Sequence, residues 1–175
     1  IQIRNRGTVG GSLAHAFPSA ELPVAMVTLD ASMLIRAKTG QRVVRAEGFF
    51  LSYMSTALEA KELLTDIEVP ELPANSGWSY QEVSRRHGDF ALAGAASVVA
   101  LDANGNIACA RLTLTGTTPI RAAEAEQALL GEKPSEALFK NAAKRATENL
   151  DQDSDIHASA EYRRSACQAL ARRAL

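Results

Sequence analysis

AGAASVVALDANGNIACARLTLTG, residues 93–116, carries the clearest local signal for the fold of this chain. Two apolar runs rich in Val, Leu, Ala and Thr flank the dipeptide Asn104-Gly105, and such runs are typical of strands. Asn and Gly tolerate positive φ angles, so this dipeptide predicts a tight type I′ turn between two antiparallel strands. We therefore expect an antiparallel hairpin in the second half of the chain.

The segments after the hairpin are Ala-, Glu- and Arg-rich, with apolar residues three and four positions apart, which predicts helices. One apolar stripe consists of Leu138, Ala142, Ala146 and Leu150, and another of Cys167, Leu170 and Ala174. Three helices are expected to begin near Arg121, Ser135 and Ser159, with Gly131 ending the first and the two serines capping the others. Strands followed by a run of helices indicate an α+β fold.

Upstream of the hairpin the pattern is mainly that of strands. Ser19 is expected to cap a helix over residues 20–30. Strands are expected over residues 1–3, 31–38, 41–46, 62–70 and 77–86. The segment PELPANSG, residues 70–77, concentrates Pro, Asn, Ser and Gly, and therefore predicts a boundary between a domain at 1–70 and a domain at 74–175. Trp78 and Tyr80, on one face of their strand, are expected to be packing residues.

The composition of the 175 residues argues against several classes of protein. Nineteen basic residues oppose 20 acidic ones for a net charge of −1, so no global attraction to nucleic acid or to a membrane surface is expected. No apolar run is long enough to predict a membrane span. Cys109 and Cys167 are isolated, and the three His residues lie far apart, so we predict no metal site and reduced thiols in a cytoplasm.

The segment Thr8-Val9-Gly10-Gly11-Ser12 is the main candidate for chemistry. Two adjacent glycines without side-chain obstruction, flanked by hydroxyls, suit a phosphate or pyrophosphate that needs several convergent N–H donors. An isolated Gly-Gly is more often a structural turn, so that alternative stays open. A nucleophile elbow is disfavoured, because that motif requires a strand, a turn and a helix on a parallel sheet.

Two further candidates have equally plain structural explanations. Glu21 is suitably placed for a ligand hydroxyl, but an acidic residue in the first turn of a helix also stabilises the helix dipole. Arg85-Arg86 can hold an anionic cofactor or a partner's carboxylates, or form a solvated rim.

Four blocks in succession resemble a known family. They are IRNRGTVGGSLAHAFPSAELP, FFLSYMSTALEAKELLTDIEVP, YQEVSRRHGDFALAGAA and SAEYRR, and they cover essentially the whole chain. Together they resemble the FAD-binding (medium) subunit of molybdenum hydroxylases, the family of xanthine dehydrogenase, aerobic carbon monoxide dehydrogenase and aldehyde oxidase. The implied fold is α+β: the second half of an FAD-binding α/β subdomain, followed by an antiparallel three-stranded sheet with a three-helix bundle.

The resemblance also implies a cofactor site. Thr8, Val9, Gly10, Gly11 and Ser12 would lie against the phosphates and ribityl oxygens of FAD, and Glu21 and Leu64 would contact the cofactor. Phe17 and the pair Gln81-Glu82 depart from the family pattern, and the latter stands where a lysine is common. Because the family's first Gly-rich FAD loop belongs upstream of Ile1, we expect the chain to be the C-terminal portion of a longer polypeptide.

The function implied by the resemblance is electron transfer. The complete enzyme is expected to pass electrons from iron–sulfur clusters through FAD to an external acceptor, with the molybdenum cofactor and the clusters on partner subunits. No residue of this chain is expected to act as a nucleophile, general base or metal ligand, and the isolated fragment is expected to be inactive. The alternative is a non-catalytic assembly module that docks partner subunits without a cofactor.

Overall fold

The structure is a computed structural model that describes residues 5–86 and 88–175. The strand predicted over residues 1–3 lies outside the described residues. The elements of the first part are, in chain order, α1 (Val9–His15), α2 (Glu21–Thr28), β1 (Ser32–Ala37), β2 (Gly40–Arg45), α3 (Ala46–Phe49), β3 (Phe50–Ser52), β4 (Ser55–Thr56) and β5 (Leu63–Glu68). Those of the second part are β6 (Ser76–Ser84), β7 (Ala91–Leu101), β8 (Ile107–Leu114), β9 (Ile120–Arg121), α4 (Ala123–Leu129), α5 (Glu136–Glu148) and α6 (Ala160–Ala174).

The strands form antiparallel sheets that stay within each part. In the first part the strand order is β2-β1-β5, with β3 and β4 as a separate pair. In the second part the order is β6-β7-β8-β9. The α+β prediction is confirmed, and the predicted three-stranded sheet gains β9, a two-residue strand paired to the end of β8. Such a short strand has no detectable alternation in sequence.

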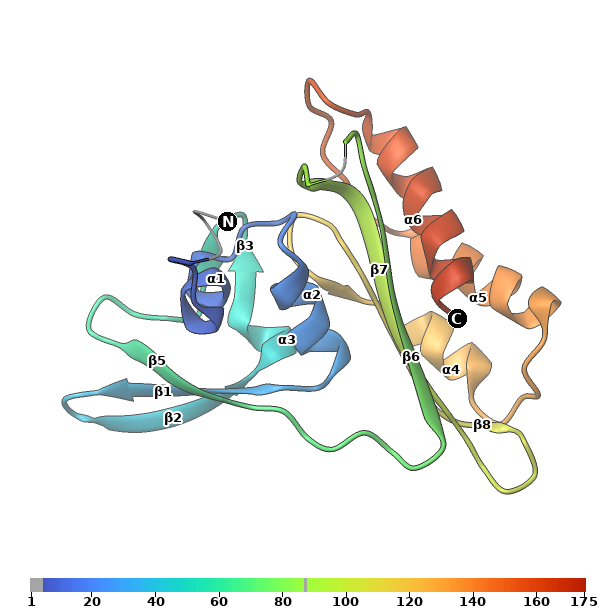
Figure 1. The fold of residues 1–175 in the computed structure, drawn as a ribbon, viewed down its shortest axis with the longest axis horizontal. Coiled ribbons are helices and arrows are strands. Elements are labelled where there is room, and N and C mark those ends of the chain that lie inside the picture. Colours follow the sequence, from blue (N-terminus) through green and yellow to red (C-terminus); the bar gives the residue numbers. More distant parts are fainter. Residues whose placement is uncertain (1–4, 87) are drawn as a thin grey trace.

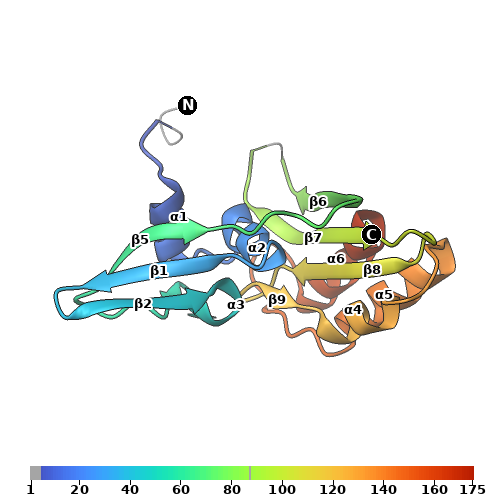
Figure 2. The same ribbon diagram turned by 90° about the horizontal axis from the view of Figure 1, so that it is seen from below.

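The helices of the second part cover one side of its sheet (Figure 1). Figure 2 shows the same arrangement from below, with β6, β7 and β8 side by side and α4, α5 and α6 behind them. The buried cluster in this part contains Leu112, Leu129 and Leu170, which come from β8, α4 and α6. Both predicted apolar stripes of the helices contribute to this cluster.

A second cluster of buried side chains lies in the first part. It joins α1, β1 and α3 through Leu13, Met33 and Phe49, each fully buried. Helix α2 contributes to this cluster on one side and contacts β7, β8 and β9 on the other. The two parts therefore meet along α2, as Figure 1 shows.

The hairpin between β7 and β8 forms as predicted, but its turn is not of type I′. Such a turn needs positive φ at both central residues, and only Gly105, at 79°, has it. Asp102 organises a longer loop instead: its carboxylate accepts the amides of Asn104 at 2.8 Å and Asn106 at 2.9 Å. The Gly105 amide donates to the Asp102 carbonyl, and a register shift follows at Leu101. An aspartate at the start of a loop accepts these hydrogen bonds, and they stabilise the longer loop more than the preference of Asn-Gly for a type I′ turn stabilises the shorter one.

Several predicted helix ends are confirmed. Ser135 caps α5 by accepting the Leu138 amide, Ser159 caps α6 by accepting the Tyr162 amide, and Gly131 follows α4 with a φ of 81°. The prediction for Ser19 is wrong. Helix α2 begins after Ala20 without a side-chain cap.

The prediction that Trp78 packs inside the protein is also wrong, because its side chain is 72% exposed. Tyr80, two residues further along β6, is half-buried, and its hydroxyl is fully buried. β6 is an edge strand, and only part of its face lies against other elements. The alternation of side chains along a strand places the two rings on one face of β6. It does not show how much of that face other elements cover.

Candidate functional site

The Gly-Gly segment begins a helix and does not form a turn with positive φ. Thr8 is the N-cap of α1, and its hydroxyl accepts the Gly11 amide at 2.9 Å while its carbonyl accepts the Ser12 amide at 3.0 Å. Neither glycine has a positive φ. The interpretation of both glycines as turn residues is therefore corrected: they stand in the first turn of a seven-residue helix.

The start of α1 presents backbone donors toward open space. Among the described residues, the amides of Val9 and Gly10 have no hydrogen-bond acceptor, as the first turn of a helix leaves them. Thr8, Val9 and Gly11 are exposed. A Cβ on Gly10 would meet no atom within 4 Å, so no described side chain fills the space beside this residue. This donor set suits the oxygens of a phosphate.

The tertiary structure brings the other two predicted residues to elements that contact α1. Glu21 begins α2, and Leu64 lies in β5, where it pairs with Ile35 of β1. Helix α1 contacts both α2 and β5. Leu64 is half-buried against the buried cluster around Phe49 in the first part, whereas Glu21 is exposed.

Glu21 lies close enough to β6 to affect two of its side chains. Partial burial and the negative charge of Glu21 raise the pKa of Glu82. Burial, together with the charges of Glu82 and Glu21, raises the pKa of Tyr80, so this phenol stays protonated. Its buried hydroxyl has no hydrogen-bond partner among the described residues. The charges that act on this phenol are therefore negative, and the pair Gln81-Glu82 stands where a lysine is common in the family.

A cleft of about 410 Å³ is lined in part by the loop that joins α1 to α2. Its lining includes Phe17, Tyr53, Arg85, Phe90 and Arg163. The rings of Phe17 and Phe90 lie 4.6 Å apart at a tilt of 46°. Arg85 thus faces this cleft, and the predicted residues at Thr8–Ser12, Glu21 and Leu64 do not line it.

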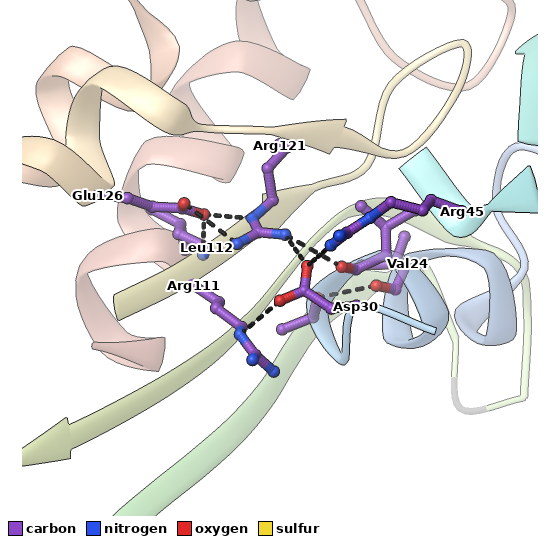
Figure 3. Close-up of polar contacts among 9 residues, drawn as sticks. Val24, Asp30, Arg45, Arg111, Leu112, Arg121 and Glu126 are labelled. Atoms are coloured by element: carbon purple, nitrogen blue, oxygen red, sulfur yellow. Dashed lines mark hydrogen bonds and ion pairs between the residues drawn. The ribbon is translucent and has the colours of Figure 1, made fainter. Parts of the chain in front are cut away.

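A cluster of charged side chains where the two parts meet was missed by sequence reasoning (Figure 3). Asp30 lies just beyond α2 and accepts Arg111 at 2.9 Å and Arg121 at 2.7 Å, while Arg45 stands at 3.4 Å. Glu126 of α4 forms a second ion pair with Arg121. Burial lowers the pKa of Arg121, but its hydrogen bonds to Glu126 and Asp30 outweigh that effect and raise it.

The residues described by the structure contain no group of three His, Cys, Asp or Glu that could hold a metal ion. Cys109 and Cys167 are free thiols. None of the helices described between residues 5 and 175 is both long enough and apolar enough to cross a membrane.

Two protein families match the chain in succession. The family described as FAD binding domain in molybdopterin dehydrogenase matches residues 1–72. The family described as CO dehydrogenase flavoprotein C-terminal domain matches residues 78–175.

Relatives and solved structures agree with these families. The chain is 42% identical to the 6-hydroxypseudooxynicotine dehydrogenase complex subunit alpha of Paenarthrobacter nicotinovorans, over 99% of this chain and 60% of that protein. Carbon monoxide dehydrogenase from Hydrogenophaga pseudoflava superposes with a TM-score of 0.94 and 35% identity, covering 99% of this chain and 61% of that one. Quinoline 2-oxidoreductase from Pseudomonas putida 86 gives a TM-score of 0.91 and 40% identity over the same shares.

These matches define a chain built from an FAD-binding domain and a flavoprotein C-terminal domain. More narrowly, the chain belongs to the family of FAD-binding (medium) subunits of molybdenum hydroxylases, as the four sequence blocks predicted. It spans about three fifths of the length of the relatives it matches.

Proposed function

We propose that this chain forms one wall of an FAD site, with the start of α1 against the phosphates. The observation that carries the proposal is the first turn of α1, where the amides of Val9 and Gly10 have no acceptor among the described residues and the space beside Gly10 is open. Membership of an FAD-binding family supports the same ligand. Thr8 and Ser12 would add hydroxyls beside these amides, and the positive end of the helix dipole would favour a negative group.

The remaining predicted residues extend the proposed wall. Glu21, exposed at the start of α2, would accept hydrogen bonds from hydroxyls of the cofactor, and Leu64 of β5 would offer an apolar contact. The residues at the start of α1 also fit the phosphates of FAD by their chemistry. The site supplies neutral donors and little obstruction at the start of α1, which a dinucleotide phosphate requires.

For the complete protein we propose a role in electron transfer. FAD, when bound, supplies the redox chemistry, while the side chains of this chain bind, orient and electrostatically tune it. The electrons would come from iron–sulfur clusters on one partner subunit, which receive them from a molybdenum cofactor on another, and would leave to an external acceptor. The proposed compartment is the cytoplasm, where the two free thiols would stay reduced.

Titration of FAD into the full-length apoprotein tests the site, with Gly10→Ala as the informative variant. An added methyl at Gly10 meets no protein atom, so the fold should keep its free energy of unfolding. It would obstruct the ligand, and loss of one bond to a charged group should weaken binding roughly tenfold or more. Gly77→Ala is the matched control, because a Cβ there is equally unobstructed but lies on β6. Equal FAD affinity for both variants would contradict the assigned site.

The alternative function is an assembly module that docks partner subunits and holds no cofactor. The exposed side chains of Trp78 and Phe90, at 72% and 70%, favour this possibility, since large exposed apolar groups often mark interfaces. The colour of the purified full-length protein separates the two functions. Flavin absorbance supports the first, whereas a colourless protein that still assembles with partner subunits supports the second.

A further inference from the structure

Helix α2 carries a proposed cofactor contact at one end and an ion cluster at the other. Glu21 is its first residue, and Asp30 stands two residues beyond its last. The N-terminal end has no side-chain cap, because Ala20 occupies the N-cap position. The position of Glu21 must therefore be set by the packing of the helix and by its anchored C-terminal end.

The anchor at the C-terminal end is made of side chains from the second part. Asp30 adopts a left-handed conformation, with a φ of 55°, which ends the helical path of the backbone beyond α2. Its two oxygens accept Arg111 from β8 at 2.9 Å and Arg121 from β9 at 2.7 Å. Both arginine side chains are only 14% exposed, so these pairs are screened less than surface pairs.

Arg121 is itself held in one orientation. The carboxylate of Glu126 in α4 accepts hydrogen bonds from its Nε and Nη2 atoms, and it also accepts the amide of Leu112 at 2.7 Å. Arg121 also donates to the carbonyl of Val27 at 3.3 Å, in the last turn of α2. A guanidinium has a planar fork of donors, so a partner fixed on one side sets where the other side points. Figure 3 shows this chain of contacts from α4 to α2.

The body of α2 transmits this anchoring along its length. Val24 and Val27 are almost completely buried, and the helix contacts β7 and β8 on the face opposite to α6. Eight residues of helix span about 12 Å, too short to bend without a Pro or a bulge within the packed turns. Pro23 lies in the first turn, where its missing N–H costs little. A shift at Asp30 would therefore move Glu21.

We propose that Asp30, held by Arg111 and Arg121, is a positioning residue for FAD binding that acts through Glu21. The inference rests on the proposed function, since it assumes that Glu21 contacts the cofactor. Under this proposal, Arg111 and Arg121 of the second part influence FAD binding without contacting FAD. The ion cluster couples the docking of the two parts to the placement of a cofactor contact.

A double-mutant cycle in the full-length protein tests this coupling. The dissociation constant of FAD is measured by flavin fluorescence for the wild type, Asp30→Asn, Glu21→Gln and the double variant. Asp30→Asn leaves two arginines without their carboxylate and should weaken FAD binding roughly tenfold, within the range typical of coupled sites. Because Asp30 acts through Glu21, the double variant should bind FAD about as weakly as the single variant that loses more affinity. Glu136→Gln, which breaks an exposed pair with Arg172 at 3.3 Å, should leave binding unchanged.

The outcomes separate this inference from the proposed function. A wild type that does not bind FAD, or a Glu21→Gln variant that binds normally, overturns the role of Glu21 and the inference with it. The inference alone is overturned if Glu21→Gln weakens FAD binding while Asp30→Asn binds FAD normally. It is also overturned if the two losses of affinity multiply in the double variant. If Asp30→Asn does not fold, Arg121→Lys keeps the charge without the fork and should weaken binding in the same direction. Unfolding of both variants at saturating FAD would show a purely structural cluster and overturn the inference.

Discussion

Gly10 and Gly11 are neighbours in the first turn of α1, yet a side chain would have different consequences at the two positions. A Cβ on Gly10 would project into open space, whereas a Cβ on Gly11 would stand 2.8 Å from the Thr8 hydroxyl. In the observed orientation of the Thr8 side chain, the space beside Gly11 is therefore occupied, whereas the space beside Gly10 is free.

We expect Gly11→Val to destabilise the protein by about 1 kcal/mol, because the new side chain displaces the Thr8 hydroxyl from the Gly11 amide. The same hydroxyl and the neighbouring amides form the proposed phosphate site, so FAD binding should fall as well. Urea unfolding and FAD titration of the full-length protein measure the two effects. Thr8→Ala removes the same hydrogen bond, so the double variant should lose no more stability than the worse single variant. An additive loss would disprove the shared cause.

Helices α5 and α6 show at the scale of an element how far local chemistry sets a boundary. Each begins at a serine whose hydroxyl accepts the amide three residues on, at 3.2 Å in both cases. The loop between them is held by Asp155, whose carboxylate accepts the amides of His157 and Ala158 and pairs with Arg163. Arg163 in turn donates to the carbonyl of Leu92 in β7, which connects the loop to the sheet.

Ser135→Ala and Ser159→Ala should each lower the free energy of unfolding by about 1 kcal/mol, because each leaves a first-turn amide without its acceptor. Chemical denaturation with a fixed m-value measures the loss. Ser165→Ala in the exposed middle of α6 is the matched control. It should be neutral or slightly stabilising, since Ala has the higher helix propensity. Equal losses at all three positions would contradict a capping role.

Asp155 should make stability depend on acid pH. Amide hydrogen bonds from Ala158 and His157, and then the pair with Arg163, lower its pKa to about 2. An unfolded aspartate has a pKa of about 3.9, so the stabilisation is complete above about pH 5 and is lost as pH falls toward about 2. Thermal midpoints measured from pH 6 to pH 2 should fall less steeply in Asp155→Asn than in the wild type. Asp151→Asn, an exposed change in the same loop, should follow the wild-type slope.

At the scale of the whole molecule, α2 connects two parts whose cores are separate. The core around Leu112 and the core around Phe49 contain no common residue. Ala96 and Val98 alternate in β7 with residues of the first of these cores, so they point to the other face of the sheet. They are nearly fully buried, and α2 is the helix that contacts β7 and β8 on that face. The second part therefore has its own core but depends on α2 to cover its other face.

The domain boundary remains a prediction, and expression of residues 74–175 alone tests it. We expect a cooperative thermal transition by circular dichroism, because every member of the core around Leu112 lies within this segment. The midpoint should be lower than in the intact chain, since loss of α2 exposes Ala96 and Val98 and leaves Arg111 without Asp30. A broad, non-cooperative trace would show that the first part completes the core and that the boundary is wrong.

The amino-acid sequence by itself determined the features that depend on neighbouring residues. Strands β1, β2, β5, β6, β7 and β8, the hairpin, the two apolar helix stripes and the caps at Ser135 and Ser159 followed from local pattern, and the family followed from the resemblance of four sequence blocks. A cap is a hydrogen bond over three residues, and a stripe is a periodicity within one helix, so both are visible in a short window. The type I′ turn failed within such a window, because the Asp102 side chain competed with the Asn-Gly backbone preference.

Only the tertiary structure decided which distant residues meet. Asp30 and Arg121 are 91 residues apart, and nothing in either segment marks the other as its partner. The exposure of Trp78 likewise depends on where the cover over β6 ends, and the role of Gly11 depends on the rotamer of Thr8. Periodicity tells which side chains share a face, but the packing of separate elements sets what stands opposite that face. The physical reason is that such contacts form only when the two parts dock, with α2 held between them.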